Sequence, residues 1–423
     1  MLTSFTASIV GFLIVFSILV LFHETGHFVA AKLNGVTVEE FAFGYPPRLL
    51  TLWRGKGFLV VDRRKLIIDH RRLRLPDNLR AGMWVKYEYE TDDAGHHYLT
   101  HVEIVDSDNP AAAGASYVEE FEAGTRYSLN VVPFGGYVKM LGEEDPSAPG
   151  SLASKRWLVR FGVLAAGSLM NLVLAVLLFS TIYLIGWDEG LPGPVQIRDV
   201  APNSPAEQAG LEVGDLVLSI DGMPVQSSLE LVEQTQARVG MPVTLYVQRG
   251  EEHFSVRLVP RANPPQGEGA MGVQISPSRF KRVSYPLWQA IPLGLQTTVA
   301  MLLAIGQGVV WMIRGLIAPD VSGPITIARA AGEAVRSGVV DVLYLTAFLS
   351  VNLCILNLIP FPGLDGGRLL FLVIEALRGG RRIAPEREGL VHFIGIVILL
   401  GFMLLVSYYD IVRWITGQPI IPQ

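Results

Sequence analysis

Residues 9–27 read IVGFLIVFSILVLFHETGH, an apolar stretch that ends in two histidines and a glutamate. No charged residue precedes it back to Met1, and about 20 predominantly apolar residues cross a bilayer. A cleaved secretion signal is the alternative, but it begins with positive charge and ends at small residues, and this stretch has neither. The sequence therefore predicts a first transmembrane helix over residues 1–30.

The whole chain has the composition of a membrane protein. Of its 423 residues, 50% are apolar and 17% are charged, and its mean hydropathy is +0.38, whereas a soluble domain carries about 25% charged residues. The formal net charge of -5 argues against a nucleic-acid partner. The single cysteine, Cys354, excludes an internal disulfide and a cysteine-based zinc cluster. Any metal must therefore be held by histidine and carboxylate side chains.

Three more uncharged stretches, residues 161–187, 342–364 and 389–409, are long enough to cross a bilayer. We expect transmembrane helices there, over residues 158–187, 340–364 and 389–413. A fifth apolar stretch, residues 284–320, is broken by Pro292 and several glycines, and we expect membrane-associated helices there that do not cross. The predicted fold class is a polytopic α-helical membrane protein with four transmembrane helices.

Loop charge predicts the orientation of these helices, because loops rich in lysine and arginine stay in the cytoplasm. Residues 48–80 are rich in lysine and arginine and residues 365–388 contain five arginines, whereas residues 193–260 are acidic. We therefore place residues 31–157 and 365–388 inside and residues 188–285 outside. Both termini are then outside.

Two segments between the predicted helices have the patterns of folded modules in water. Residues 193–262 alternate strand-like stretches with turn signals and contain one helical stretch, Ser228–Arg238. The cytoplasmic region contains a β-rich insertion over about 53–120. It ends in a membrane-associated hairpin over about 126–142, in which Gly135-Gly136 leaves a strand edge open.

Histidines in the insertion offer a weak metal signal. His96, His97 and His101 lie near Asp92 and Asp93, but their spacing is not that of zinc ligands. The first interpretation is a hairpin turn with solvated side chains.

His23-Glu24-Thr25-Gly26-His27 is an H-E-x-x-H motif. Positions i and i+4 share one face of a helix, so both imidazoles can reach one metal ion, and Glu24 can take a proton from water. Histidines that cap a membrane helix at its interface are the alternative. Ionisable groups at this depth are costly and usually functional, which favours the metal site.

Asp365 is the expected third ligand, because a catalytic zinc takes three protein ligands. It follows Pro360 and Pro362 at the cytoplasmic end of the third predicted span, where the chain can turn the carboxylate inward. The alternative is an Asp that caps the next helix. His27 and Asp365 can share a metal only if an even number of crossings separates them, so residues 284–320 should not cross.

Residues 200–215, VAPNSPAEQAGLEVGD, followed by Ile220-Asp221-Gly222, resemble a PDZ domain of bacterial proteases. Such domains bind an extended peptide at a sheet edge. A spacer domain with an unused groove is the alternative.

The intramembrane H-E-x-x-H, the PDZ-like domain and residues 357–367, NLIPFPGLDGG, together resemble the site-2 protease family, in its bacterial regulator-of-sigma-E protease branch. PFGGYVKM at 133–140 and VSGPI at 321–325 support the likeness. The resemblance implies an intramembrane zinc metalloendopeptidase of the bacterial plasma (inner) membrane, with its active site towards the cytoplasm. It assigns roles to the following residues: zinc on His23, His27 and Asp365, Glu24 as base, substrate backbone on Asn357 and more weakly Asn352, and a substrate clamp at Gly135 and Gly136.

The resemblance also implies partners. The substrates would be single-pass membrane proteins whose external domain another protease has already removed, such as an anti-sigma factor or a signal-peptide remnant. The PDZ-like domain would select them by size or bind peptide C-termini or segments, and the lipid bilayer is the other partner. Two departures stand out: residues 193–262 have room for one PDZ domain where some members carry two, and the insertion has no recognised counterpart.

Two other functions fit parts of the sequence. A polytopic transporter or scaffold with a peptide-binding module would bind no zinc. A membrane-tethered metalloprotease for soluble substrates would also carry H-E-x-x-H, but in a polar domain, whereas here the motif ends an apolar run.

Overall fold

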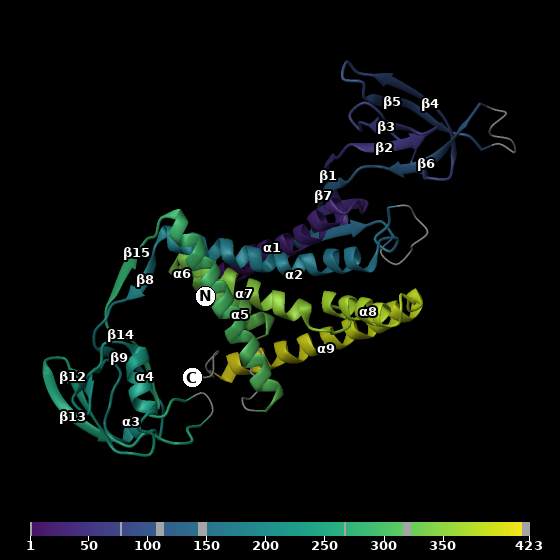
Figure 1. Cartoon of the computed structure of the whole chain (residues 1–423). Coiled ribbons are helices and arrows are strands. Elements are labelled where there is room, and N and C mark those ends of the chain that lie inside the picture. The colour runs from purple at the N-terminus through teal and green to yellow at the C-terminus, as the bar shows by residue number, and fades with distance from the viewer. Residues whose placement is uncertain are drawn as a thin grey trace. The chain divides into compact units, whose positions relative to one another are not determined.

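A computed structural model describes residues 2–76, 78–106, 114–142, 150–265, 268–315 and 323–416 (Figure 1). Val321 and Ser322 of the VSGPI phrase and the end of the 284–320 segment lie outside these residues. The helices are α1 Leu2–Leu33, α2 Trp157–Ile185, α3 Pro205–Gln208, α4 Ser228–Gln236, α5 Leu287–Ile313, α6 Pro324–Ser337, α7 Val339–Leu358, α8 Asp365–Leu377 and α9 Pro385–Thr416.

The strands fall into four groups. A two-stranded sheet pairs β1 Val38–Arg54 with β7 Arg126–Met140, and another pairs β8 Trp187–Gly190 with β15 Phe280–Val283. A closed barrel contains β2 Gly57–Val61, β3 Arg64–Ile68, β4 Trp84–Thr91, β5 His97–Ile104 and β6 Ser116–Glu122. A six-stranded sheet contains β9 Val195–Val200, β10 Leu216–Ile220, β11 Met223–Pro224, β12 Val243–Arg249, β13 Glu252–Leu258 and β14 Val273–Pro277.

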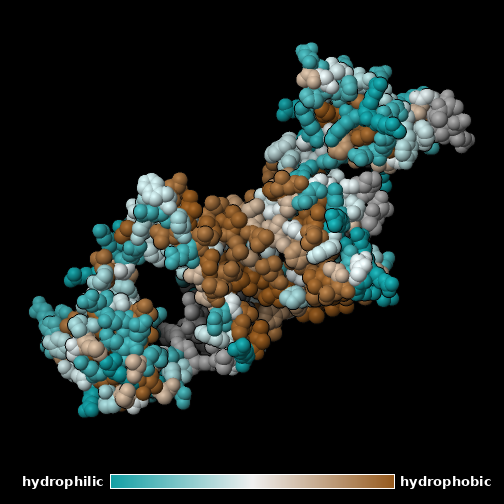
Figure 2. All heavy atoms as spheres, viewed as in Figure 1, coloured by the Kyte–Doolittle hydropathy of each residue, from teal (hydrophilic) through white to brown (hydrophobic). Residues whose placement is uncertain are grey.

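Five of the described helices are long and apolar enough to cross a membrane: α1, α2, α5, α7 and α9. Figure 2 shows apolar side chains over the visible surface of the helices, as expected for helices that face lipid. The chain is therefore a multi-pass membrane protein by length and composition.

The fifth apolar stretch differs from the expected interrupted segment. Leu287–Ile313 is one continuous helix, α5, with Pro292 inside its second turn. Proline there removes only one backbone hydrogen bond, so the remaining turns continue unbroken. At 27 residues, α5 is about 40 Å long and exceeds the roughly 30 Å hydrocarbon core.

The β1–β7 sheet is made by two long strands that each fold back on themselves. Residues 40–43 of β1 pair with residues 136–139 of β7 on one side and with residues 126–129 on the other. The second half of β1 pairs again with 126–130. The arm of β7 from Gly136 to Met140 is therefore an outer edge of this sheet, and its ladder partner among the described residues is β1 alone.

The inserted segment is the closed barrel, in the order β2-β3-β5-β4-β6. Alternate side chains of β2 and β3 point inward, and their core includes Leu59, Val61, Leu66 and Ile68, all fully buried. Asp92 forms the β4–β5 turn, where its carboxylate accepts from the amides of Ala94 and His96.

The six-stranded domain follows the predicted pattern and extends beyond it. Strands and helix expected between 193 and 262 are present as β9, β10, β12, β13 and α4, and β14 adds an edge strand beside β9. Its core includes the fully buried Ile197, Ile220, Leu231 and Leu245. β14 lies beyond residue 262, where the predicted domain ended. It belongs to the domain because it pairs with β9, a long-range contact that the local sequence pattern does not show.

Candidate metal centre

Helices α1 and α2 approach each other closely at the H-E-x-x-H motif. A Cβ on Gly26 of α1 would collide with the carbonyl of Ala166, and a Cβ on Gly167 of α2 would collide with Nε2 of His27. Small residues let membrane helices pack backbone against backbone. Here they leave room for two imidazoles between the helices.

The two histidines of the motif and Asp365 converge on one point. Nε2 of His23 lies 3.2 Å from Nε2 of His27, and Oδ2 of Asp365 lies 3.0 and 3.3 Å from these two nitrogens. Both histidines are buried. No other group of three or more His, Cys, Asp or Glu among the described residues, the histidines of the barrel included, is close enough to hold a metal.

These three atoms fit a zinc ion. Ligand atoms about 2.0–2.1 Å from a tetrahedral zinc are about 3.3 Å apart, close to the separations seen here. Oδ2 of Asp365 is buried and makes no contact of hydrogen-bond geometry within the part of the chain that is described. A carboxylate with an unused buried oxygen is the donor a cation needs.

The other nitrogen of each imidazole decides which nitrogen faces the metal. Nδ1 of His27 donates to the carbonyl of Val163 at 2.8 Å, which leaves the Nε2 lone pair for the metal. Nδ1 of His23 lies 3.3 Å from the side-chain amide nitrogen of Asn171, whose Oδ1 has no hydrogen-bond partner among the described residues. A half-turn of that amide brings Oδ1 to the same place, where it accepts from Nδ1 of His23.

Asn171 is itself fixed from a third helix. It is fully buried in α2, and its backbone carbonyl accepts a hydrogen bond of 2.7 Å from the hydroxyl of Ser350 in α7. The amide is therefore held against His23 by the packing of α2 on α7.

A tight turn aims Asp365 at the histidines. α7 ends at Leu358, and Pro360 and Pro362 cannot continue it. The chain folds back so closely that a Cβ on Gly366 would collide with the carbonyl of Ile359, and one on Gly367 with that of Phe361. Asp365 then begins α8, where a negative charge also suits the helix dipole.

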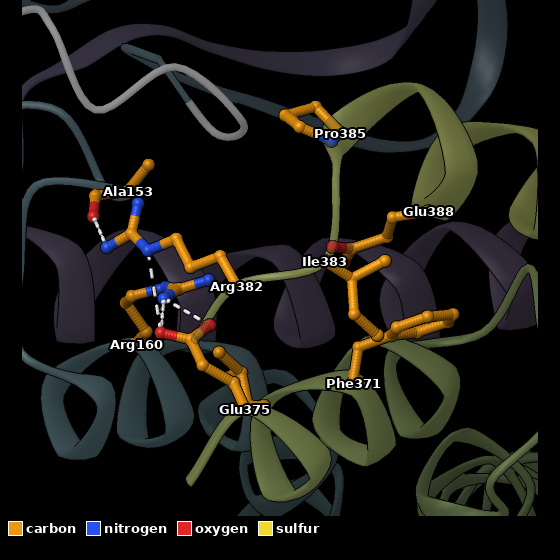
Figure 3. Close-up of a pocket in the computed structure, with 9 residues that line it drawn as sticks. Ala153, Arg160, Phe371, Glu375, Arg382, Ile383, Pro385 and Glu388 are labelled. Atoms are coloured by element: carbon orange, nitrogen blue, oxygen red, sulfur yellow. Dashed lines mark hydrogen bonds and ion pairs between the residues drawn. The ribbon is translucent and has the colours of Figure 1, made fainter. Parts of the chain in front are cut away.

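The far end of α8 is anchored to α2 by an ion pair (Figure 3). Nη1 of Arg160 lies 2.9 Å from both carboxylate oxygens of Glu375. Arg382 lies 3.5 Å from the same carboxylate and donates to the carbonyl of Ala153 at 2.6 Å. α8 is thus fixed at its end to the helix that carries Gly167 and Asn171.

A cavity of about 850 Å³ opens beside the three ligands. Its walls include Glu24, Tyr45, Asp365 and the edge strand Tyr137–Met140 of β7. A Cβ on Gly136 would press on the side chain of Glu24, so the glycine lets this strand approach the acid. The cavity thus presents a carboxylate, a strand edge and the ligand cluster to one volume.

The sequence-predicted residues divide into those at the cluster and those away from it. His23, His27, Glu24 and Asp365 meet as described. The amide nitrogen of Asn357 lies 3.5 Å from Nδ1 of His23, at the limit of a hydrogen bond. Asn352 instead donates to the carbonyl of Phe348 in its own helix.

The two glycines of the hairpin lie beside the motif helix. Gly135 has φ +83°, and a Cβ there would crowd the ring of Tyr45, while Gly136 faces Glu24. Both glycines therefore allow the close approach of β7 to α1.

Three residues of the centre were missed by sequence reasoning. Gly167 and Asn171 lie four residues apart in GSLMN, within an apolar run, and Tyr45 lies in a strand far from the motif. The one sequence signal for Asn171 was a polar residue within an apolar run, on the same helical face as a glycine. Nothing in the local sequence pointed to Tyr45.

Comparisons with known proteins place the chain in a family. The model of the family described as Peptidase family M50 matches residues 11–59 and 95–402. Zinc metalloprotease RasP of Geobacillus kaustophilus (strain HTA426) is 31% identical over 427 residues, which cover 96% of this chain and 98% of the relative. Regulator of sigma-W protease RasP of Bacillus subtilis (strain 168) is 28% identical over 426 residues, covering 97% and 99%. Among solved structures, the PDZ domain of an SdrC-like protein from Listeria monocytogenes is 26% identical and covers 20% of this chain and 87% of its own, with a TM-score of 0.18.

Gly167→Ala is expected to abolish zinc binding, because the new methyl group would occupy the space of the His27 imidazole. Gly162→Ala is the matched control on the same helix, since no atom lies within 4 Å of its added Cβ. Zinc content of the two purified proteins is the measurement. Equal zinc in both would contradict the packing described here.

Asn171→Leu is expected to weaken zinc binding by about 10- to 100-fold, the usual effect of removing the partner of a ligating histidine. Asn352→Leu makes the same change one helix away, where the amide bonds only its own backbone, and should leave zinc affinity unchanged. Competition with a chelator measures both. An equal loss in the two variants would mean that the Asn171 amide does not orient His23.

Proposed function

Because the chain belongs to peptidase family M50, the site-2 proteases, we propose that this centre hydrolyses peptide bonds of membrane proteins within or near their transmembrane segments. The chain is a zinc metalloprotease, and its class of reaction is regulated intramembrane proteolysis. The convergence of His23, His27 and Asp365 beside Glu24 is the observation that supports this role most directly.

The proposed chemistry needs one group besides the ligands. When bound, zinc lowers the pKa of a water molecule towards neutrality and polarises the scissile carbonyl. Glu24 lines the same cavity as His27 and Asp365. It accepts the proton of the attacking water and delivers it to the leaving amine. A carboxylate suits both steps because it serves as base first and as acid afterwards.

The edge of β7 supports the handling of an extended substrate. A transmembrane helix hides its carbonyls in its own hydrogen bonds, so the segment to be cut must unfold locally. The strand Tyr137–Met140 lines the cavity and pairs on one side with β1. An unfolded segment can add to its other side as a further strand, with Gly135 and Gly136 admitting it next to Glu24. We expect Asn357, whose amide nitrogen lies 3.5 Å from Nδ1 of His23, to hold the substrate backbone.

Other assignments stay predictions. They include four transmembrane helices with both termini outside, a PDZ-like role for residues 193–262, and substrates already trimmed by another protease. The name of the Bacillus subtilis relative, a regulator of sigma-W protease, supports a membrane-bound regulator of a sigma factor as the substrate class.

Glu24→Gln is expected to retain zinc and lose cleavage, because the amide keeps the shape of the acid but cannot accept a proton. Zinc content and cleavage of a reporter containing a transmembrane segment are measured on wild type and variant in the same lipid. A transporter or scaffold would show neither zinc nor cleavage in wild type. Cleavage by the variant at the wild-type rate would remove Glu24 from the mechanism.

The orientation of α5 can be measured with single cysteines in a Cys354→Ala background. If α5 lies on the outer leaflet, a membrane-impermeant maleimide added to intact cells should label Gln289→Cys and Arg314→Cys alike. Glu251→Cys in the six-stranded domain is the positive control, and Asp92→Cys in the barrel should label only after permeabilisation. Labelling of only one end of α5 would show a fifth crossing and overturn the four-span topology.

A further inference from the structure

The barrel formed by β2–β6 is electrically two-sided. Residues 56–80, which form β2, β3 and the loop after them, contain eight lysines and arginines and three acids, whereas residues 81–122 contain one lysine and ten acids. The family match leaves out residues 60–94, which include all of β3 and β4. Residues 56–80 are therefore locally positive, although the chain as a whole has a negative net charge.

The strand order of the barrel is that of an OB fold with its first strand moved to the end. Read from β6, the barrel runs β6-β2-β3-β5-β4 and closes on β6, and its one parallel pair is β3 with β5. An OB fold has the order 1-2-3-5-4 with strands 3 and 5 parallel, and it binds oligonucleotides on the face of strands 2 and 3. In this barrel β2 and β3 take those two places.

The outer face of β2 and β3 continues onto β5 as a row of three large side chains, two of them aromatic. The register places Phe58 opposite Ile67, and Ile67 opposite Tyr98. All three are half-buried and outward, since they alternate with the buried core positions of their strands. The row spans three strands and offers two rings for stacking.

Cations surround the two rings. Nζ of Lys65 lies 4.0 Å from the ring centre of Phe58. Nζ of Lys56 and the guanidinium of Arg72 lie 5.4 and 5.9 Å from that of Tyr98. Aromatic rings interleaved with cations are what proteins present to single-stranded nucleic acid, because bases stack while phosphates meet the charges.

We propose that the β2–β3–β5 face of the barrel binds single-stranded nucleic acid, with bases on Phe58 and Tyr98 and phosphates on Lys56, Lys65 and Arg72. The site is independent of the metal centre and adds a binding activity to the proposed protease function. It also reverses, for this face alone, the expectation drawn from the net charge. Acids border the face, since Glu122 lies opposite Phe58 and Glu90 opposite Tyr98, and they would confine a polyanion to the central strands.

The geometry favours a nucleic acid over a peptide or a membrane. A closed barrel has no free edge, so a peptide cannot add to it as a strand. Membrane-surface elements bury large apolar side chains in the interface, whereas Phe58, Ile67 and Tyr98 are half-buried and flanked by charge. Figure 2 shows the visible side of the barrel as mostly hydrophilic.

The test uses the full chain in phosphatidylcholine nanodiscs and fluorescein-labelled 12-nucleotide oligomers of dT and of rU, followed by anisotropy at 50 mM salt. Saturable binding that weakens linearly on a log–log plot against salt is expected. The two oligomers separate a DNA from an RNA preference. Glu24→Gln should bind as wild type does, which keeps this result distinct from the fate of the protease proposal. Absence of saturable binding to both oligomers would overturn the proposal.

Three variants and one control locate the site. Phe58→Leu keeps an apolar side chain but removes the ring, and should weaken binding about five- to hundredfold. Lys65→Glu and Arg72→Glu should each weaken it and reduce the salt slope by about one. Lys86→Glu makes the same charge change on the exposed, acidic side of β4 and should have little effect. Two outcomes would refute a nucleic-acid site on this face. One is an equal loss of oligomer binding with Lys86→Glu. The other is that the three variants lose binding only to vesicles containing phosphatidylglycerol and bind the oligomers as wild type does.

Discussion

Three atoms with lone pairs, two imidazole nitrogens and one carboxylate oxygen, lie 3.0 to 3.3 Å apart inside a cluster of apolar helices. They repel one another at that distance, and a carboxylate away from water loses hydration worth several kcal/mol unless it is compensated. A divalent cation removes both costs at once, which is why a site of this kind couples metal binding to folding. α1 and α8 bring the three atoms together, and α2 packs beside them through Gly167, Val163 and Asn171.

The three atoms can come together because glycines leave out side chains at the closest contacts. Gly26 and Gly167 let α1 and α2 pack at backbone distance, and Gly366 lets the turn before α8 fold onto itself. At each place any side chain would collide with a backbone carbonyl or a ligating ring. The polar groups then settle the chemistry: Val163 and Asn171 select the nitrogen that each histidine offers. The Arg160–Glu375 pair fixes the end of α8 away from Asp365, so the carboxylate cannot drift along the helix axis.

The meeting of His23, His27 and Asp365 could be predicted from sequence because their relation is short-range or set by the membrane. His23 and His27 are one helical turn apart. Asp365 is the carboxylate that ends a later apolar run on the same predicted side of the membrane. The supporting residues escaped because their relation is purely tertiary: Asn171 and Tyr45 reach the site through the packing of elements far apart in the chain. The strands of the six-stranded domain followed their alternation, whereas β14 joined by a long-range pairing that no local pattern shows. The continuity of α5 was not predicted for a different reason. A proline near the start of a helix removes one backbone hydrogen bond and leaves the later turns intact.

The barrel is inserted between β1 and β7, next to a site whose close contacts leave no room for larger side chains. Its two connections leave from β1 and β7, and they lie side by side, with the amide of Gly55 donating to the carbonyl of Thr125 at 2.8 Å. An inserted domain whose ends are adjacent adds to the host without separating the strands it interrupts. The β1–β7 ladder therefore runs up to the insertion point, where Arg54 pairs with Arg126, and Gly136 keeps its place against Glu24. Because the barrel closes on itself, it contributes no strand edge that could compete with β7 for an extended substrate. Its surface is then free to differ from the rest of the chain, and its positive side does so although the protein as a whole is acidic.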